Sequence, residues 1–188
     1  MKNKTLLLVV ILITSFVKGQ SFTLNNSESK LKWTGKEITT KEHYGSIDFK
    51  SGTITLKDNK PVYGKFIVDM ITLKNEDLPE DYRGRLEGHL KSDDFFSVDK
   101  FSEAILEFTT SSFKNSEEYN IKGNLTIKGT THPVDFTMNF IDNHWKANLV
   151  FDRSKYDVKF RSGSFFENLG DKLIYDDIII ETELKFNR

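Results

Sequence analysis

The chain has 188 residues, of which 37% are hydrophobic and 29% charged, and its formal net charge is −1. This balance leaves no basic excess for binding nucleic acid, and the absence of cysteine excludes disulfides, thiolate metal sites and cysteine nucleophiles. Phenylalanine is abundant, with 16 residues against 2 tryptophans and 6 tyrosines. A single domain of this length must bury that ring surface in a core or offer it to an apolar ligand.

The first 19 residues have the composition of a secretory signal peptide. A positive start is followed by an apolar run over residues 6–17, and Val17 and Gly19 are small side chains ahead of a cut before Gln20. The run is shorter than the roughly 20 residues that span a bilayer. We therefore expect a signal peptide over residues 1–19, with an uncleaved anchor as the alternative, and a periplasmic or secreted domain over residues 20–188 without a membrane span.

Cleavage at this position makes the protein more acidic. It removes three lysines and no acidic residue, so the formal net charge changes from −1 to −4. We do not expect such a chain to adhere to an anionic membrane surface. Without cysteine in an oxidising compartment, the fold must be held by its core alone.

Alternating apolar and polar residues predict β-strands through the first half of the domain. Short strands are expected over residues 31–33, 47–49 and 54–56, with a turn at 57–60. The next strand, 61–72, is apolar on both faces. One face carries Val62, Phe66, Val68 and Met70, and the other carries Tyr63, Ile67 and Ile71. Something must therefore cover each face.

Residues 79–91 do not follow the alternation of apolar and polar residues and instead predict a helix. Pro79 suits a helix start, and Tyr82, Leu86 and Leu90 recur at every fourth position. Two glycines weaken the helix by about 1 kcal/mol each relative to alanine. A helix here would cover an otherwise exposed apolar patch, and the second face of strand 61–72 is a candidate for that patch.

The second half alternates more regularly. Strands are expected over residues 121–127, 134–140, 145–151 and 178–186, with turns at 129–131 and 142–143. Short turns between consecutive strands indicate an antiparallel meander. The prediction is an all-β fold, a single antiparallel barrel of about eight or more strands with one inserted α-helix, because closure removes exposed sheet edges.

Motifs for catalysis or metal binding are not found. The four histidines have no H-x-H or helical i, i+4 spacing, and no G-x-S-x-G elbow is complete. The acid pairs Asp93-Asp94 and Asp176-Asp177 are interpreted as solvated loop residues, because strand neighbours point to opposite faces. We predict no catalytic residue, no metal and no cofactor.

Several ordered segments resemble one family. Residues 89–101 read H-L-K-S-D-D-F-F-S-V-D-K-F, residues 104–108 read A-I-L-E-F, and residues 123–134 read G-N-L-T-I-K-G-T-T-H-P-V. An H-Y-G element stands at residues 43–45 and D-R-S at 152–154. In this order they resemble the signatures of the YceI-like lipid/polyisoprenoid-binding family.

The resemblance implies a lipocalin-like barrel, exported from the cytoplasm, that encloses a long-chain isoprenoid or similar amphiphilic lipid and carries no catalytic residues. A polyprenyl lipid and an isoprenoid quinone are the ligands considered. Two regions depart from the family pattern, the charged stretch 76–85 and the loop 161–169, which contains Phe165 and Phe166. Both are expected near the mouth of a pocket.

The candidate ligand-binding residues lie on expected inward strand faces, on the helix and in the motif after it. Those expected to form apolar walls are Phe49, Phe66, Val68, Met70, Leu86, Leu90, Phe95, Phe96, Phe108, Leu125, Ile127, Phe136 and Met138. Trp33, His43 and His89 are candidates for polar contacts to a headgroup. Two alternatives stay open: a packed barrel that acts as a protein-interaction module, and a hydrolase or isomerase with His43 or His89 as base. The sequence also leaves a homodimer open.

Overall fold

The computed structural model describes residues 19–115 and 118–187, so nearly all of the predicted signal peptide lies outside the described residues. Within these residues the chain forms nine strands, one α-helix and two short 3-10 helices. In chain order the elements are β1 (Gln20–Thr23), β2 (Lys30–Glu37), β3 (Glu42–Lys57), β4 (Lys60–Asn75), α1 (Glu80–Lys91), β5 (Glu103–Phe113), β6 (Glu118–Ile127), β7 (Thr130–Ile141), β8 (His144–Asp152), η1 (Arg153–Tyr156), η2 (Gly170–Lys172) and β9 (Ile174–Leu184).

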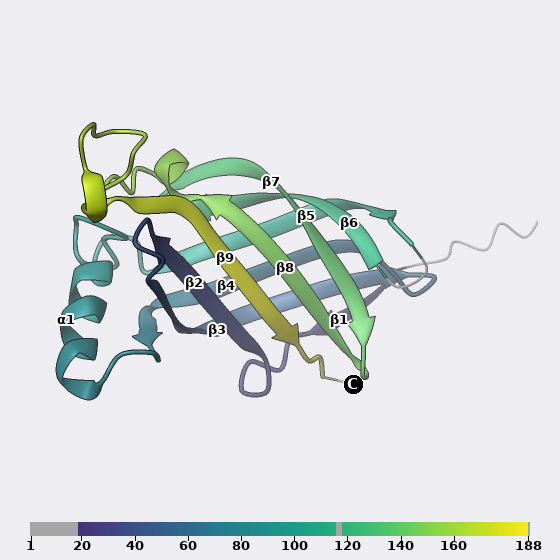
Figure 1. The fold of residues 1–188 in the computed structure, drawn as a ribbon. Coiled ribbons are helices and arrows are strands. Elements are labelled where there is room, and N and C mark those ends of the chain that lie inside the picture. Colours follow the sequence, from purple (N-terminus) through teal and green to yellow (C-terminus); the bar gives the residue numbers. More distant parts are fainter. Residues whose placement is uncertain (1–18, 116–117, 188) are drawn as a thin grey trace, which may run out of the picture.

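Eight of these strands close into an antiparallel barrel. The order is β3-β2-β9-β8-β7-β6-β5-β4, and pairing between β3 and β4 completes the ring, while the short β1 pairs with β3 outside it. Figure 1 shows the tilted strands around one axis, with α1 across one end. Closure leaves little sheet edge exposed. Across the described residues, the predicted all-β barrel with one inserted helix is confirmed.

Three tight turns join neighbouring strands. Asp58-Asn59, Lys128-Gly129 and Asp142-Asn143 all have φ between 49° and 72°, as a two-residue hairpin turn of this kind requires. The meander β6-β7-β8 is therefore as predicted. The β6–β7 turn begins one residue earlier than expected, because Thr130 and Thr131 already pair with β6.

Strand β3 corrects the prediction of two short strands over residues 47–49 and 54–56. It is one strand of 16 residues. Irregular pairing with β4 near Ser46 and near Phe49 bends it, and bulges of this kind increase the local twist. The bent strand pairs with β2 through its first part and with β1 through its second.

The helix lies elsewhere than predicted. Leu86 and Leu90 line the barrel interior, and α1 crosses the barrel end (Figure 1). Ile71, on the outer face of β4, remains 56% exposed. Because β4 continues to Asn75, the helix starts beyond the rim and folds over the opening. Across residues 19–115 and 118–187, no helix is both long and apolar enough to cross a membrane.

The barrel is solidly packed at the end away from α1. Leu24, Ile54, Ile121 and Trp145 are each at most 4% exposed there, and none of them lines the interior cavity. Burial of such side chains supplies most of the folding free energy, at about 1.5–3 kcal/mol each. These side chains therefore form a packed core at this end, and the rest of the interior is free for another role.

Candidate ligand-binding cavity

The barrel encloses a cavity of about 290 Å³ whose walls come from every strand from β2 to β9 and from α1. Along β9 the lining residues run from Ile174 at the α1 end to Leu184 near the opposite end. Apolar side chains therefore line the cavity along most of the barrel. Such a lining suits a single extended apolar chain better than a compact ligand.

Fifteen of the sixteen predicted ligand-binding residues line this cavity. They are Trp33, His43, Phe49, Phe66, Val68, Met70, Leu86, His89, Leu90, Phe95, Phe96, Leu125, Ile127, Phe136 and Met138. For those on strands the alternation had the correct phase, since a slip of one residue would turn the wall outward; Leu86, His89, Leu90, Phe95 and Phe96 come from α1 and the segment after it.

The prediction for Phe108 is corrected by the structure, because this residue belongs to the packed core and not to the cavity lining. It is 1% exposed and contacts Phe136 edge to face, with ring centroids 6.0 Å apart. Its strand neighbours on the two sides are Gly64 and Gly123. A Cβ at Gly64 would collide with the Phe108 ring, so the ring occupies the space that this missing side chain leaves.

The candidate set omitted wall residues of two kinds. Those on β8 and β9, such as Leu149 and Ile180, follow the same alternation and could have been included. Phe160 and Arg161 come from the loop after η1. Arg161 has a positive φ of 50°, and this irregular segment has no periodicity from which a prediction could be made.

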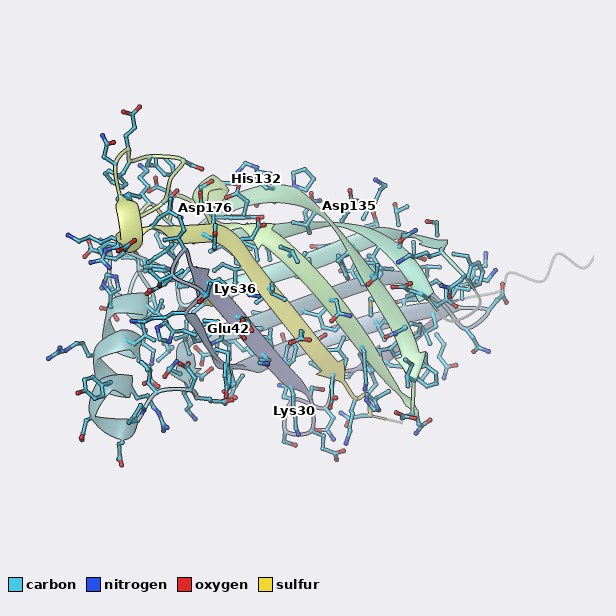
Figure 2. The ribbon with its side chains drawn as sticks, in the orientation of Figure 1. Lys30, Lys36, Glu42, His132, Asp135 and Asp176 are labelled. Carbon is cyan, nitrogen blue, oxygen red and sulfur yellow. The ribbon has the colours of Figure 1, made fainter. Side chains whose placement is uncertain are left out.

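The polar side chains of the lining gather at the α1 end. Lys36, Glu37, His43, His89 and Arg161 all come from elements at that rim, and Thr182 on β9 is the exception. Figure 2 places Lys36 beside Glu42 on this side of the barrel, where they form an ion pair of 3.2 Å. The cavity thus has a polar end and a long apolar end.

Two of the three predicted headgroup contacts already have protein partners. Trp33 Nε1 donates to the carbonyl of Lys74 at 3.0 Å, and His43 Nδ1 donates to Asp77 Oδ2 at 2.8 Å. Burial raises the pKa of the Asp77 carboxyl, but hydrogen bonds from the Tyr44 amide, His43 and Asn75 outweigh this and hold the pKa below its usual range. The His43–Asp77 contact ties β3 to the link between β4 and α1, and the Trp33 bond ties β2 to β4.

His89 differs from Trp33 and His43 because the protein offers its buried Nε2 no hydrogen-bond partner among the described residues. The ring packs edge to face against Phe160 and Phe95, with centroids at 4.3 and 5.6 Å. A buried polar atom without a partner costs about 1–3 kcal/mol. His89 therefore offers the cavity a hydrogen-bonding group that the protein leaves unused.

Arg153, from the D-R-S motif, supports the cavity rim from behind. It is fully buried, forms an ion pair of 3.2 Å with Asp176, and donates to the carbonyls of Val158, Ile174 and Tyr175. Asp176 lies in β9 with 17% of its side chain exposed. Its interpretation as a solvated loop acid is therefore wrong, because a buried guanidinium requires a counter-charge.

The fold and cavity define a class: a single antiparallel eight-stranded barrel with an apolar interior cavity and a helix across one end. Within that class the chain belongs to the YceI-like domain family, whose sequence model matches residues 22–186.

Individual relatives agree with this assignment. The chain is similar to UPF0312 protein YE1254 of Yersinia enterocolitica, with 30% identity over 71% of this chain and 70% of the relative. It is also similar to Protein YceI of Shigella flexneri, with 27% identity over 74% and 72% of the two chains.

Solved structures share the fold. Burkholderia cenocepacia BcnA superposes with a TM-score of 0.66 at 18% identity, covering 86% of this chain and 98% of that one. A polyisoprenoid binding domain from Saccharophagus degradans, described as implicated in plant cell wall breakdown, has a TM-score of 0.59 at 10% identity, covering 88% and 97%.

Proposed function

We propose that this protein is an exported, non-catalytic carrier that holds a long-chain isoprenoid or similar amphiphilic lipid in its barrel, for transport, storage or stress protection. The observation that carries the proposal is the shape and polarity of the cavity. Apolar side chains line it along most of the barrel, and its polar lining groups, except Thr182, lie at the α1 end.

This arrangement orients the ligand. Burial of each CH₂ group is worth about 0.8 kcal/mol, so a long tail binds tightly with few polar anchors. The tail extends toward Leu184, and the headgroup lies at the α1 end near His89. A polyprenyl lipid or an isoprenoid quinone has this form. The description of the Saccharophagus degradans neighbour as a polyisoprenoid binding domain supports the same class.

Ligand identification is the direct test. Protein purified from its own host is extracted with organic solvent, and the extract is analysed by mass spectrometry for a stoichiometric lipid. We expect an isoprenoid at about one per chain. Export is tested separately: N-terminal sequencing of the same protein is expected to give Gln20 first, as cleavage of a signal peptide over residues 1–19 requires. An empty extract, with no gain in melting temperature on adding a polyprenol, would contradict the carrier function and favour a protein-interaction module.

The headgroup contact has its own test. His89→Phe keeps a ring in the cavity and removes the hydrogen-bonding nitrogen. Because one hydrogen bond is worth about 0.5–1.5 kcal/mol, we expect affinity for a polyprenol to fall several-fold while affinity for an isoprenoid hydrocarbon without oxygen is unchanged. His132→Phe is the matched control, since His132 lies outside the cavity lining and its Nε2 pairs with the Lys155 carbonyl. Equal losses for both ligands would contradict the contact.

A further inference from the structure

The segment between η1 and η2 presents two adjacent phenylalanines to solvent. Phe165 and Phe166 are 45% and 50% exposed. In Figure 1 this loop stands clear of the barrel at the end where α1 lies. Beside it, Ile38 is 43% exposed, and its amide donates to the carbonyl of Leu173 at 3.0 Å. Large apolar side chains are thus exposed at the end where the cavity has its polar groups.

The base of this loop is firmly held. The amides of Phe165 and Phe166 both donate to the carbonyl of Ser162, at 3.2 and 3.0 Å. Ser162 is fully buried, and its hydroxyl donates to Asp176 at 2.8 Å. Figure 2 shows Asp176 at this end of the molecule. Because Asp176 is in turn paired with the buried Arg153, the loop presents the two rings on a fixed support.

The same loop also forms part of the cavity wall and carries cations. Phe160 and Arg161 line the cavity. Lys159 Nζ lies 5.3 Å from the Phe165 ring centre, and the Arg161 guanidinium lies 5.0 Å from that of Phe160. Segments that bind a membrane interface combine Trp, Phe or Leu side chains with Lys or Arg, because the apolar groups enter the boundary between headgroups and acyl chains while the cations stay in the polar layer.

We propose that this loop docks the α1 end of the barrel onto a lipid bilayer with zwitterionic headgroups, with Phe165 and Phe166 inserted in the interface. The proposal rests on the proposed carrier function. It explains how a lipid reaches the cavity. A lipid that crossed water would expose its tail, at a cost of about 0.8 kcal/mol for each CH₂ group. When the open end of the barrel is docked on the bilayer, the tail passes into the cavity without this exposure.

Charge decides which bilayer surface fits. The chain without its first 19 residues has a formal charge of −4, which opposes binding to anionic lipids. Lys159 is paired with Asp157, with Nζ 2.5 Å from Oδ1, so Arg161 is the cation beside the rings that would meet a lipid phosphate, and one such contact needs no net negative surface. Phosphatidylcholine meets both requirements.

The test measures transfer of a fluorescent polyprenol from phosphatidylcholine vesicles to the protein. The variant Phe165→Ser/Phe166→Ser removes the proposed anchor without touching the cavity wall. Phe113→Ser/Phe140→Ser is the matched control, because these phenylalanines are 52% and 50% exposed but lie on strands near the opposite end. Affinity is measured separately, with the polyprenol delivered from a cyclodextrin complex.

We expect the transfer rate of the unaltered protein to rise with vesicle concentration. In the loop variant the rate should fall about tenfold or more, because the two rings that docking would bury in the bilayer are lost. In the control variant the rate should change less than about twofold. Affinity from cyclodextrin should be unchanged in both. Equal transfer rates in the two variants would overturn docking while leaving the carrier function intact. Absence of polyprenol binding by the unaltered protein would instead overturn the carrier function itself. Self-association that the loop variant abolishes, without vesicle binding, would overturn docking in favour of a dimer interface.

Discussion

The guanidinium of Arg153 and the carboxylate of Asp176 form a buried ion pair that joins η1 to β9, with Arg153 Nη2 3.2 Å from Asp176 Oδ1. Burial lowers the pKa of Arg153, and the charge of Asp176 opposes that change. Removing one member of such a pair leaves a buried charge uncompensated, which typically costs about 3–5 kcal/mol.

We therefore expect Asp176→Asn to lower the free energy of unfolding by about 3 kcal/mol, measured by urea denaturation. Asp177→Asn is the matched control, because Asp177 is the exposed neighbour on the same strand, and it should change stability by less than about 0.5 kcal/mol. Equal stability of the two single variants would show that the pair is not needed.

The contact between His43 and Asp77 predicts a dependence of stability on acid. The folded state lowers the pKa of Asp77, so its contribution is present above the unfolded value of about 3.9 and is lost as the pH falls through the folded value. Asp77→Asn should lower the free energy of unfolding by about 1–2 kcal/mol at pH 7, and the difference from the unaltered protein should shrink toward pH 2.

Urea denaturation at pH 7, 4 and 2.5 measures this difference. Asp99→Asn provides the control, since Asp99 is exposed and should behave like the unaltered protein throughout. A deficit in Asp77→Asn that stays constant with pH would mean that the side chain acts through its shape and not through its charge.

Sequence periodicity predicted the barrel and most of its inner wall because each strand has one face inside. Leu125 and Ile127 are found inward for that reason alone. Cross-strand neighbours could not be predicted: Phe108 points inward as its strand alternation requires, but it packs in the core because Gly64, its partner on β4, leaves room for the ring. The partner of Asp176 is likewise remote in sequence, and Phe160 lies in a loop where no period exists.

Replacing Gly64 or Gly84 with alanine should change the stability of the protein in opposite directions. Gly64 lies under the Phe108 ring, so an added Cβ would overlap it, and Gly64→Ala should destabilise the protein by about 1–3 kcal/mol. Gly84 lies in α1, where a Cβ would point into open space, and Gly84→Ala should stabilise by about 0.5–1 kcal/mol through helix propensity. Thermal unfolding of both variants measures this, and a loss in Gly84→Ala would indicate that α1 needs its flexibility to cover the cavity.

A substitution that fills the cavity should raise the stability of the ligand-free protein and lower its affinity for the lipid. Ala147 lines the wall and pairs with Met138 on the adjacent strand. Ala147→Leu adds apolar volume to an existing hollow, so we expect the ligand-free protein to gain about 1–2 kcal/mol, measured by urea denaturation. Affinity for a polyprenol should fall, because the same volume is taken from the tail. Ile54→Val, in the packed core outside the cavity, is the control and should lose about 1 kcal/mol of stability with affinity unchanged. If Ala147→Leu bound the polyprenol as well as the unaltered protein does, the tail would have to lie outside the barrel.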